Sequence, residues 1–243
     1  FENLTHLNYT VSSFVCNHCA NDCEIKEVRM EGAEPLYYGC RCDRYNLKKE
    51  KKAKTAHFDA FEYRKKKLFE YAGVSQSKAE NGQNAKTTIG IPLALGSWQF
   101  LPLFARFFKQ LGANVVLSGT TGHDVIQTGI ETVSAQTCFP VKVMYGHVAR
   151  LLEQRPDYIF LPSVVSMAAN YPQNRHNQLC PYVQSVPYQI RTAFAEKLGK
   201  TKLVMPVIRL GDGDRNLRKG FIDAAASLGI SSRRAHRALE TAL

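Results

Sequence analysis

The sequence predicts an α/β protein: a doubly wound, mainly parallel sheet of the Rossmann or flavodoxin type, preceded by a small cysteine-rich metal-binding module. Two observations predict this fold. From residue 87 onward, short apolar runs alternate with helical segments, a pattern typical of parallel βαβ crossovers. Five of the seven cysteines stand within residues 16–42, at spacings that metal sites use.

The α/β lobe is expected over residues 87–243. Strands are expected at 87–92, 114–119, 130–135, 158–165 and 202–208. Helices are expected at 98–112, 123–130, 139–154, 186–199 and 214–229, with a last helix from Ser231. The strands are continuous apolar runs, as expected when helices cover both faces of a sheet.

Two segments precede this lobe. Residues 1–45 form the cysteine-rich module, with strand-like pieces at 24–30 and 35–39. Residues 46–86 are expected to contain a basic helix followed by a polar linker without apolar periodicity. The sequence begins with Phe1 and stops inside a helical pattern, so we expect it to be a fragment of a longer protein.

The formal net charge is +11, and much of it lies in the basic stretches 47–54 and 63–69. Such charge can bind polyanions, but no motif that reads nucleic acid accompanies it. We therefore interpret it as a solvated helix face. No run of 18 apolar residues and no signal segment is present, so we predict a cytoplasmic protein with reduced thiols and no membrane partner.

The first cysteine constellation is Cys16-x2-Cys19-x3-Cys23, followed later by Cys40-x-Cys42. Two thiolates separated by two residues can turn inward on one metal, and a distant pair on a returning segment can close the site. We predict that Cys16, Cys19, Cys23 and Cys42 bind the metal and that Cys40 is spare. The spacing leaves two candidates open, a 4Fe–4S cluster and a structural zinc ion.

Cys138 and Cys180 form a second candidate pair. Cys138 follows the strand predicted at 130–135 and precedes a helix, with Pro140 in its first turn. Cys180 ends the long loop after the next strand, again just before a helix. Backbone N–H groups at a helix N-terminus stabilise a thiolate, and loops at the carboxyl ends of parallel strands line ligand crevices. The pair is therefore either a cofactor site or two small apolar residues of the core.

Several stretches resemble a known family: "IGIPLALGSWQFLPLFARFFKQLGANVVLSG", "QTCFPVKVMYGHVARLLE", "DYIFLPSVV" and "CPYVQSVPYQI". They are similar to the 2-hydroxyacyl-CoA dehydratase-related domain, above all as found in large CoA-substrate-specific enzyme activases. Those proteins also carry a segment similar to "FVCNHCANDCEI…CDRY" just ahead of this domain. The resemblance implies that Cys138 and Cys180 are iron–sulfur ligands. The third ligand that it implies has no counterpart in this chain.

The resemblance implies an accessory or electron-transfer portion of an anaerobic acyl-CoA dehydratase activase-like protein. The implied partners are other domains of the parent protein, including an ATPase activator module, with acyl-CoA bound only by the full protein. The chain itself lacks an ATPase motif, because Phe194 stands where a P-loop ending in "GKTK" needs its first glycine. We also find no complete catalytic constellation.

Two further features have alternative interpretations. The "LGDGDRN" loop at 210–216 is interpreted as a turn in which Asp214 caps a helix, rather than as a phosphate loop. His147 is either a polar group beside a cluster or an ordinary core histidine. A rival function is also open: a non-catalytic binding module with a structural zinc site and a basic surface for nucleic acid or an acidic partner.

Overall fold

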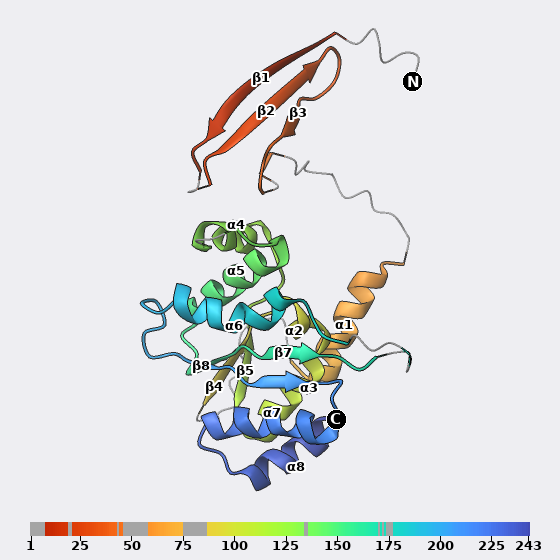
Figure 1. Ribbon diagram of the computed structural model, residues 1–243, viewed down its shortest axis with the longest axis vertical. Helices are drawn as coiled ribbons and strands as arrows, with labels where there is room; N and C mark the ends of the chain where they lie inside the picture. Colours follow the sequence, from red (N-terminus) through yellow and green to blue (C-terminus); the bar gives the residue numbers. More distant parts are fainter. Residues whose placement is uncertain are drawn as a thin grey trace. The chain divides into compact units, whose positions relative to one another are not determined.

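The computed structural model describes residues 8–18, 21–42, 44–45, 58–74, 87–133, 136–169, 171, 173 and 177–243. The chain divides into two compact units, Phe1–Phe58 and Asp59–Leu243, which we call the N-terminal unit and the α/β unit. Figure 1 shows the elements of both units in chain order.

The N-terminal unit is an antiparallel sheet of three strands in the order β1-β2-β3. Its strands are β1 (Tyr9–Cys16), β2 (Cys23–Met30) and β3 (Leu36–Tyr38). The second and third strands confirm the strand-like pieces predicted at 24–30 and 35–39. The first strand was not predicted, although "YTVSSFVC" is rich in the aromatic and β-branched residues that favour strands.

The α/β unit contains two parallel sheets. The larger sheet has four strands in the order β5-β4-β6-β8: β4 (Thr88–Ile91), β5 (Asn114–Leu117), β6 (Tyr158–Phe160) and β8 (Lys202–Val204). The smaller sheet pairs β7 (Ser163–Ser166) with β9 (Val207–Arg209). Eight helices occur in the described part of the chain: α1 (Ala60–Ala72), α2 (Gly96–Gln99), α3 (Leu101–Gln110), α4 (His123–Thr132), α5 (Phe139–Glu153), α6 (Pro181–Ala193), α7 (Asp214–Ser227) and α8 (Ser232–Ala242). The predicted mixed α/β fold with a parallel sheet is confirmed.

Two prolines explain why strands predicted as single elements are each divided in two. Pro162 separates β6 from β7 within the predicted strand 158–165, and Pro206 separates β8 from β9 within 202–208. Proline lacks the N–H that a ladder requires. The carbonyl of Pro206 still accepts from the Ser163 N–H at 2.9 Å, so the two chain paths continue side by side across the break.

The larger sheet has a hydrophobic core on each face. Adjacent residues of β6 show the division, since Phe160 belongs to one core and Ile159 to the other. The first core joins the sheet to α1, α3, α7 and α8 and contains six buried phenylalanines: Phe69, Phe104, Phe107, Phe108, Phe160 and Phe221. The second core joins it to α5 and α6. Helices therefore cover both faces, which explains the continuous apolar strands in the sequence.

The strand predicted at 130–135 is wrong, because helix α4 extends through Thr132. Its β-branched residues suggested a strand, but Gly129 and Gly146 bring α4 against α5. A Cβ on Gly129 would overlap the Lys142 carbonyl, and a Cβ on Gly146 would overlap the Val125 carbonyl. The two helices therefore touch at their backbones, and this tertiary contact overrides the local strand propensity.

Helix α1 lies inside the predicted basic helical stretch. Asp59 caps its N-terminus by accepting from the N–H groups of Phe61 and Glu62, at 2.9 Å and 3.0 Å. Gly73 ends it in the left-handed conformation, with φ of 60°. Its buried side packs on α3. Residues 46–57 and 75–86, which include most of the linker predicted at 73–86, lie outside the described residues.

Candidate functional site

The hairpin of β1 and β2 places two of the predicted ligands opposite each other. Cys16 ends β1 and Cys23 begins β2, and the two are paired across the strands. Residues paired in this way present their side chains on the same face of a sheet. Cys16 is buried and Cys23 is half-buried. The third predicted ligand of this hairpin, Cys19, lies outside the described residues.

Cys40 and Cys42 form the second half of this candidate site. Their sulfur atoms lie 3.5 Å apart, and both side chains are half-buried. Burial raises the pKa of the Cys42 thiol, and the adjacent Cys40 raises it further. Gly39, with φ of 89°, brings this segment against β2, where a Cβ would overlap the Glu24 carbonyl. Only glycine allows so close an approach at this position.

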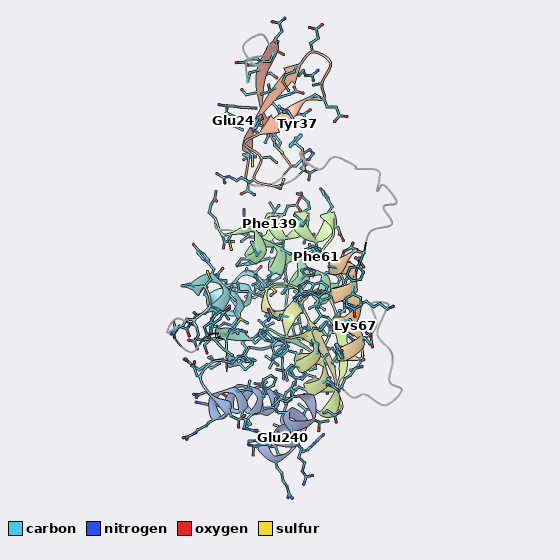
Figure 2. All side chains as sticks on the ribbon, turned by 90° about the vertical axis from the view of Figure 1, so that its right-hand side faces the viewer. Glu24, Tyr37, Phe61, Lys67, Phe139 and Glu240 are labelled. Atoms are coloured by element: carbon cyan, nitrogen blue, oxygen red, sulfur yellow. The ribbon has the colours of Figure 1, made fainter. Side chains whose placement is uncertain are left out.

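Tyr45 connects the two halves. Its hydroxyl is hydrogen-bonded to the Cys16 thiol, and this bond raises the pKa of Tyr45. Its ring lies between Phe14 and Tyr37, with centroid separations of 5.5 Å and 5.3 Å. Tyr37, which lies on the sheet (Figure 2), donates its own O–H to Glu27 at 3.0 Å. The segment after Cys42 is thereby held on the face that carries Cys16.

The donor set is all sulfur, which suits zinc and iron–sulfur centres. No group of three or more His, Cys, Asp or Glu side chains within the described residues is arranged to hold a metal ion. Among the six described cysteines, only Cys40 and Cys42 have their sulfur atoms in direct contact. The predicted four-cysteine site, which includes Cys19, therefore stays a prediction.

Cys138 and Cys180 are the N-cap residues of α5 and α6, and both are exposed. The carbonyl of Cys138 accepts from the Lys142 N–H at 3.2 Å, and that of Cys180 accepts from Gln184 at 3.2 Å. Pro140 stands in the first turn of α5, as predicted. No disulfide or hydrogen bond joins the two described sulfur atoms. Both cysteines can therefore take an external ligand, but their convergence on one stays a prediction.

The position of Cys138 in the fold needs a correction. It lies in the connection between α4 and α5, because the strand expected before it is helical. Cys180 follows β7 through a long connection, as expected. Of these two cysteines, only Cys180 follows a parallel strand. A place in the ligand crevice at the carboxyl ends of the strands is therefore expected for Cys180 and not for Cys138.

His147 is the centre of a buried polar network that the sequence only partly indicated. Its Nδ1 lies 2.8 Å from Ser118 Oγ, and its Nε2 lies 2.9 Å from Thr121 Oγ1. Ser118 Oγ also accepts from the Leu93 N–H at 2.8 Å. Burial lowers the pKa of His147 to about 4, so the imidazole is neutral near pH 7.

This network connects the loops that follow β4 and β5 at their carboxyl ends. In the strand order β5-β4-β6-β8, the sheet continues from β4 to β5 on one side and to β6 on the other, so the strand order reverses next to these loops. Such a position is where open parallel sheets bind ligands. Both ring nitrogens of His147 are already bonded, so its role here is to position these loops rather than to transfer protons. The polar run "SGTTG" directly after β5 was the sequence signal for Ser118 and Thr121.

The "LGDGDRN" loop is also held by internal contacts. The Ser166 hydroxyl and the Arg209 guanidinium hydrogen-bond to Asp212 and lower its pKa, and Asn177 contributes to the same effect. The predicted cap is wrong, since Gly213 is the N-cap of α7 and Asp214 lies in the first turn. The carboxylate of Asp214 interacts favourably with the positive end of the helix dipole, and its negative charge would repel a bound phosphate.

The basic charge of α1 is partly neutralised within the helix. Lys65 pairs with Glu62 at 2.6 Å, and Lys67 pairs with Glu70 at 2.9 Å. These pairs favour the interpretation of a solvated helix face over a surface for nucleic acid. None of the helices in the described ranges has the length and apolar character needed to cross a membrane.

A four-stranded parallel sheet covered by helices on both faces defines a mixed α/β protein. The chain belongs to the family described as CoA enzyme activase uncharacterised domain (DUF2229), which matches residues 88–243. The match agrees with the resemblance seen in the sequence. Neither the curated proteins nor the solved structures compared with the chain include a match.

Proposed function

We propose that the chain is an accessory or electron-transfer portion of an anaerobic acyl-CoA dehydratase activase-like protein. In this function Cys138 and Cys180 contribute thiolates to an iron–sulfur cluster that residues elsewhere in the parent protein complete. The N-terminal cysteines hold a metal centre of their own, either a second cluster or a zinc ion. The partners are other domains of the parent protein, including an ATPase activator module, and acyl-CoA is bound only by the full protein.

One observation carries this proposal: the match to the CoA enzyme activase family spans the whole region that contains Cys138 and Cys180. Both sulfur atoms are exposed at helix N-termini, where backbone N–H groups favour the thiolate form that metals bind. When bound, a cluster supplies one-electron chemistry. The contribution of this chain is to present the two thiolates at the N-termini of α5 and α6. Each helix has a proline in its first turn, where the missing N–H costs no helical hydrogen bond.

The test is anaerobic purification and reconstitution of the parent protein, followed by iron and sulfide analysis and absorbance spectroscopy. A broad band near roughly 400 nm is expected for thiolate-bound iron–sulfur clusters. Replacing both Cys138 and Cys180 by serine should reduce the iron content, whereas replacing the half-buried Ser185 of α6 by alanine should not. Unchanged iron and sulfide in the double-cysteine variant would contradict the assignment of these two residues.

A further inference from the structure

The two edges of the N-terminal sheet differ in how well they are protected. In the strand order β1-β2-β3, the edge strands are β1 and β3. An edge strand has unpaired backbone groups to which another strand can add, and proteins limit this with short, charged, proline-containing or bulged edges. The edge at β3 is protected in two ways, because the strand has three residues and Pro35 directly precedes it. None of these features protects the edge at β1.

Strand β1 is long, regular and uncharged. Its eight residues, YTVSSFVC, include neither a charged side chain nor a proline. Its pairing with β2 runs from Tyr9 to Cys16 without a register shift, so no bulge bends the edge away. Every second residue of β1 directs its N–H and C=O groups away from β2, and no strand within the described residues lies on that side. Because seven of its side chains are also exposed, the length of β1 is open to a second strand.

We propose that β1 pairs antiparallel with β1 of a second copy of the chain, about a two-fold axis at Ser12. The sheets of the two copies then form one continuous sheet. A second copy fits the charge of β1, because an uncharged strand meets itself without placing like charges opposite each other. Two-fold pairing also uses the same edge on both copies, so it forms a closed dimer. This interface goes beyond the proposed function and does not depend on its metal centres.

The side chains of β1 match each other in this register. Opposite residues of an antiparallel pair lie on the same face of the sheet, so this axis places Tyr9 opposite Val15 of the second copy. On the other face, Phe14 lies opposite Thr10 of the second copy. Each is a pair of an aromatic and a β-branched residue, which stabilises neighbouring strands. The paired segment ends before Cys16, so the interface does not use this cysteine.

Sedimentation equilibrium of the full chain under reducing conditions tests the pairing, and a monomer–dimer equilibrium is expected. Ser12→Lys places two lysines opposite each other at the axis, so the dissociation constant should rise about fivefold. Within one copy the new amine lies beside Glu27, which accepts from the Ser12 hydroxyl at 3.3 Å, so the fold should be kept. Leu36→Lys is the matched control, because it adds the same charge at an exposed position of β3, opposite Val28. It should leave the dissociation constant unchanged.

Hydrogen exchange with mass spectrometry gives a second measurement that requires no variant. Amides of β1 should gain protection as the protein concentration rises, and this gain should exceed that of β3. A monomer at every concentration, or a dimer that Ser12→Lys and Leu36→Lys weaken equally or not at all, would overturn the inference. Protection of β1 that does not depend on concentration would also overturn it, because another segment of the same copy would then cover the edge.

Discussion

The two units of this chain are stabilised in different ways. In the described part of the N-terminal unit, only Cys16 and Ile25 are buried apolar residues, while large apolar side chains remain exposed on β1 and β3. The α/β unit instead has two cores, one of which contains six buried phenylalanines. A sheet of three short strands with so small a core is not expected to be stable by itself. The α/β unit therefore depends on packing, and we expect the N-terminal unit to depend on the metal centre proposed for its cysteines.

Every residue of β1 except Cys16 is exposed. Tyr9, Val11 and Val15 share one face of the strand, and Phe14 and Cys16 share the other, where the Tyr45 ring packs on Phe14. The face with the cysteines is therefore the one that the segment up to Tyr45 covers. Metal binding at this end would close the same face, which is how small domains with weak cores gain stability.

The largest expected effect is that of metal removal. If the N-terminal unit depends on a metal–thiolate centre, chelation at neutral pH should abolish protection of the backbone amides of β1 and β2. Structural zinc sites contribute roughly 10 kcal/mol or more of folding free energy, so protection should fall by more than about a thousandfold. Hydrogen exchange with mass spectrometry measures both units in one sample. Peptides from α3 and α7 serve as the control and should keep their protection.

A second prediction concerns the packing of the α/β unit. Gly146→Ala places a methyl group against the Val125 carbonyl, where only backbone can move aside. Overpacking of this kind costs about 3 kcal/mol, and urea denaturation followed by helical circular dichroism measures the loss. Gly96→Ala is the control, because its Cβ would meet only Phe100 at ordinary contact distances of 3.7 Å or more. Equal stability of the two variants would contradict the close contact between α4 and α5.

The sequence predicted the α/β unit better than the N-terminal unit, for physical reasons. Buried parallel strands such as Thr88–Ile91 are apolar runs that local composition reveals. The extension of α4 through Thr132 depended on contacts between Gly129 and α5, and no local pattern contains them. Likewise, spacing indicated which cysteines cluster but not which sulfur atoms approach each other. The contact between Cys40 and Cys42 depends on the close passage of Gly39 along β2.

A smaller, pH-dependent effect is expected from His147. Its pKa is about 4 in the folded state and 6.5 in an ordinary environment, so the unfolded chain binds the proton first as pH falls. The contribution of neutral His147 to the free energy of unfolding is therefore complete above pH 6.5 and is lost progressively as the pH falls towards 4. Linkage gives a loss of about 2 kcal/mol between pH 7.5 and pH 5. Urea denaturation of the full chain across this range measures it.

Variants separate this contribution from that of the other titrating groups. His147→Gln, which can keep one bond to the hydroxyls of Ser118 or Thr121, should be less stable at pH 7.5 and should lack the His147 part of the pH slope. His236→Gln, at an exposed position of α8, should leave the slope unchanged. An unaltered slope in the first variant would show that His147 is not the group responsible.

The smallest expected effect is that of Tyr45. It distinguishes a direct action of the Tyr45 hydroxyl on the Cys16 thiolate from support of the sheet by the aromatic rings. The hydroxyl interacts with the Cys16 thiol, which raises the pKa of Tyr45, and a hydrogen bond to a thiolate ligand would stabilise the charged form that a metal requires. Tyr45→Phe removes that bond and keeps the ring packing on Phe14 and Tyr37. One hydrogen bond contributes about 1 kcal/mol, so we expect zinc affinity, measured by competition with a chromophoric chelator, to fall about fivefold.

Tyr37→Phe is the matched control for this prediction. It removes an equivalent hydroxyl from the neighbouring ring, but that hydroxyl donates to Glu27 and not to sulfur. Its zinc affinity should therefore equal that of the wild type, even though the sheet loses one hydrogen bond. A similar loss of affinity in both variants would mean that the rings support the metal centre only through the stability of the sheet. A loss confined to Tyr45→Phe would mean that the hydroxyl acts on the Cys16 thiolate directly.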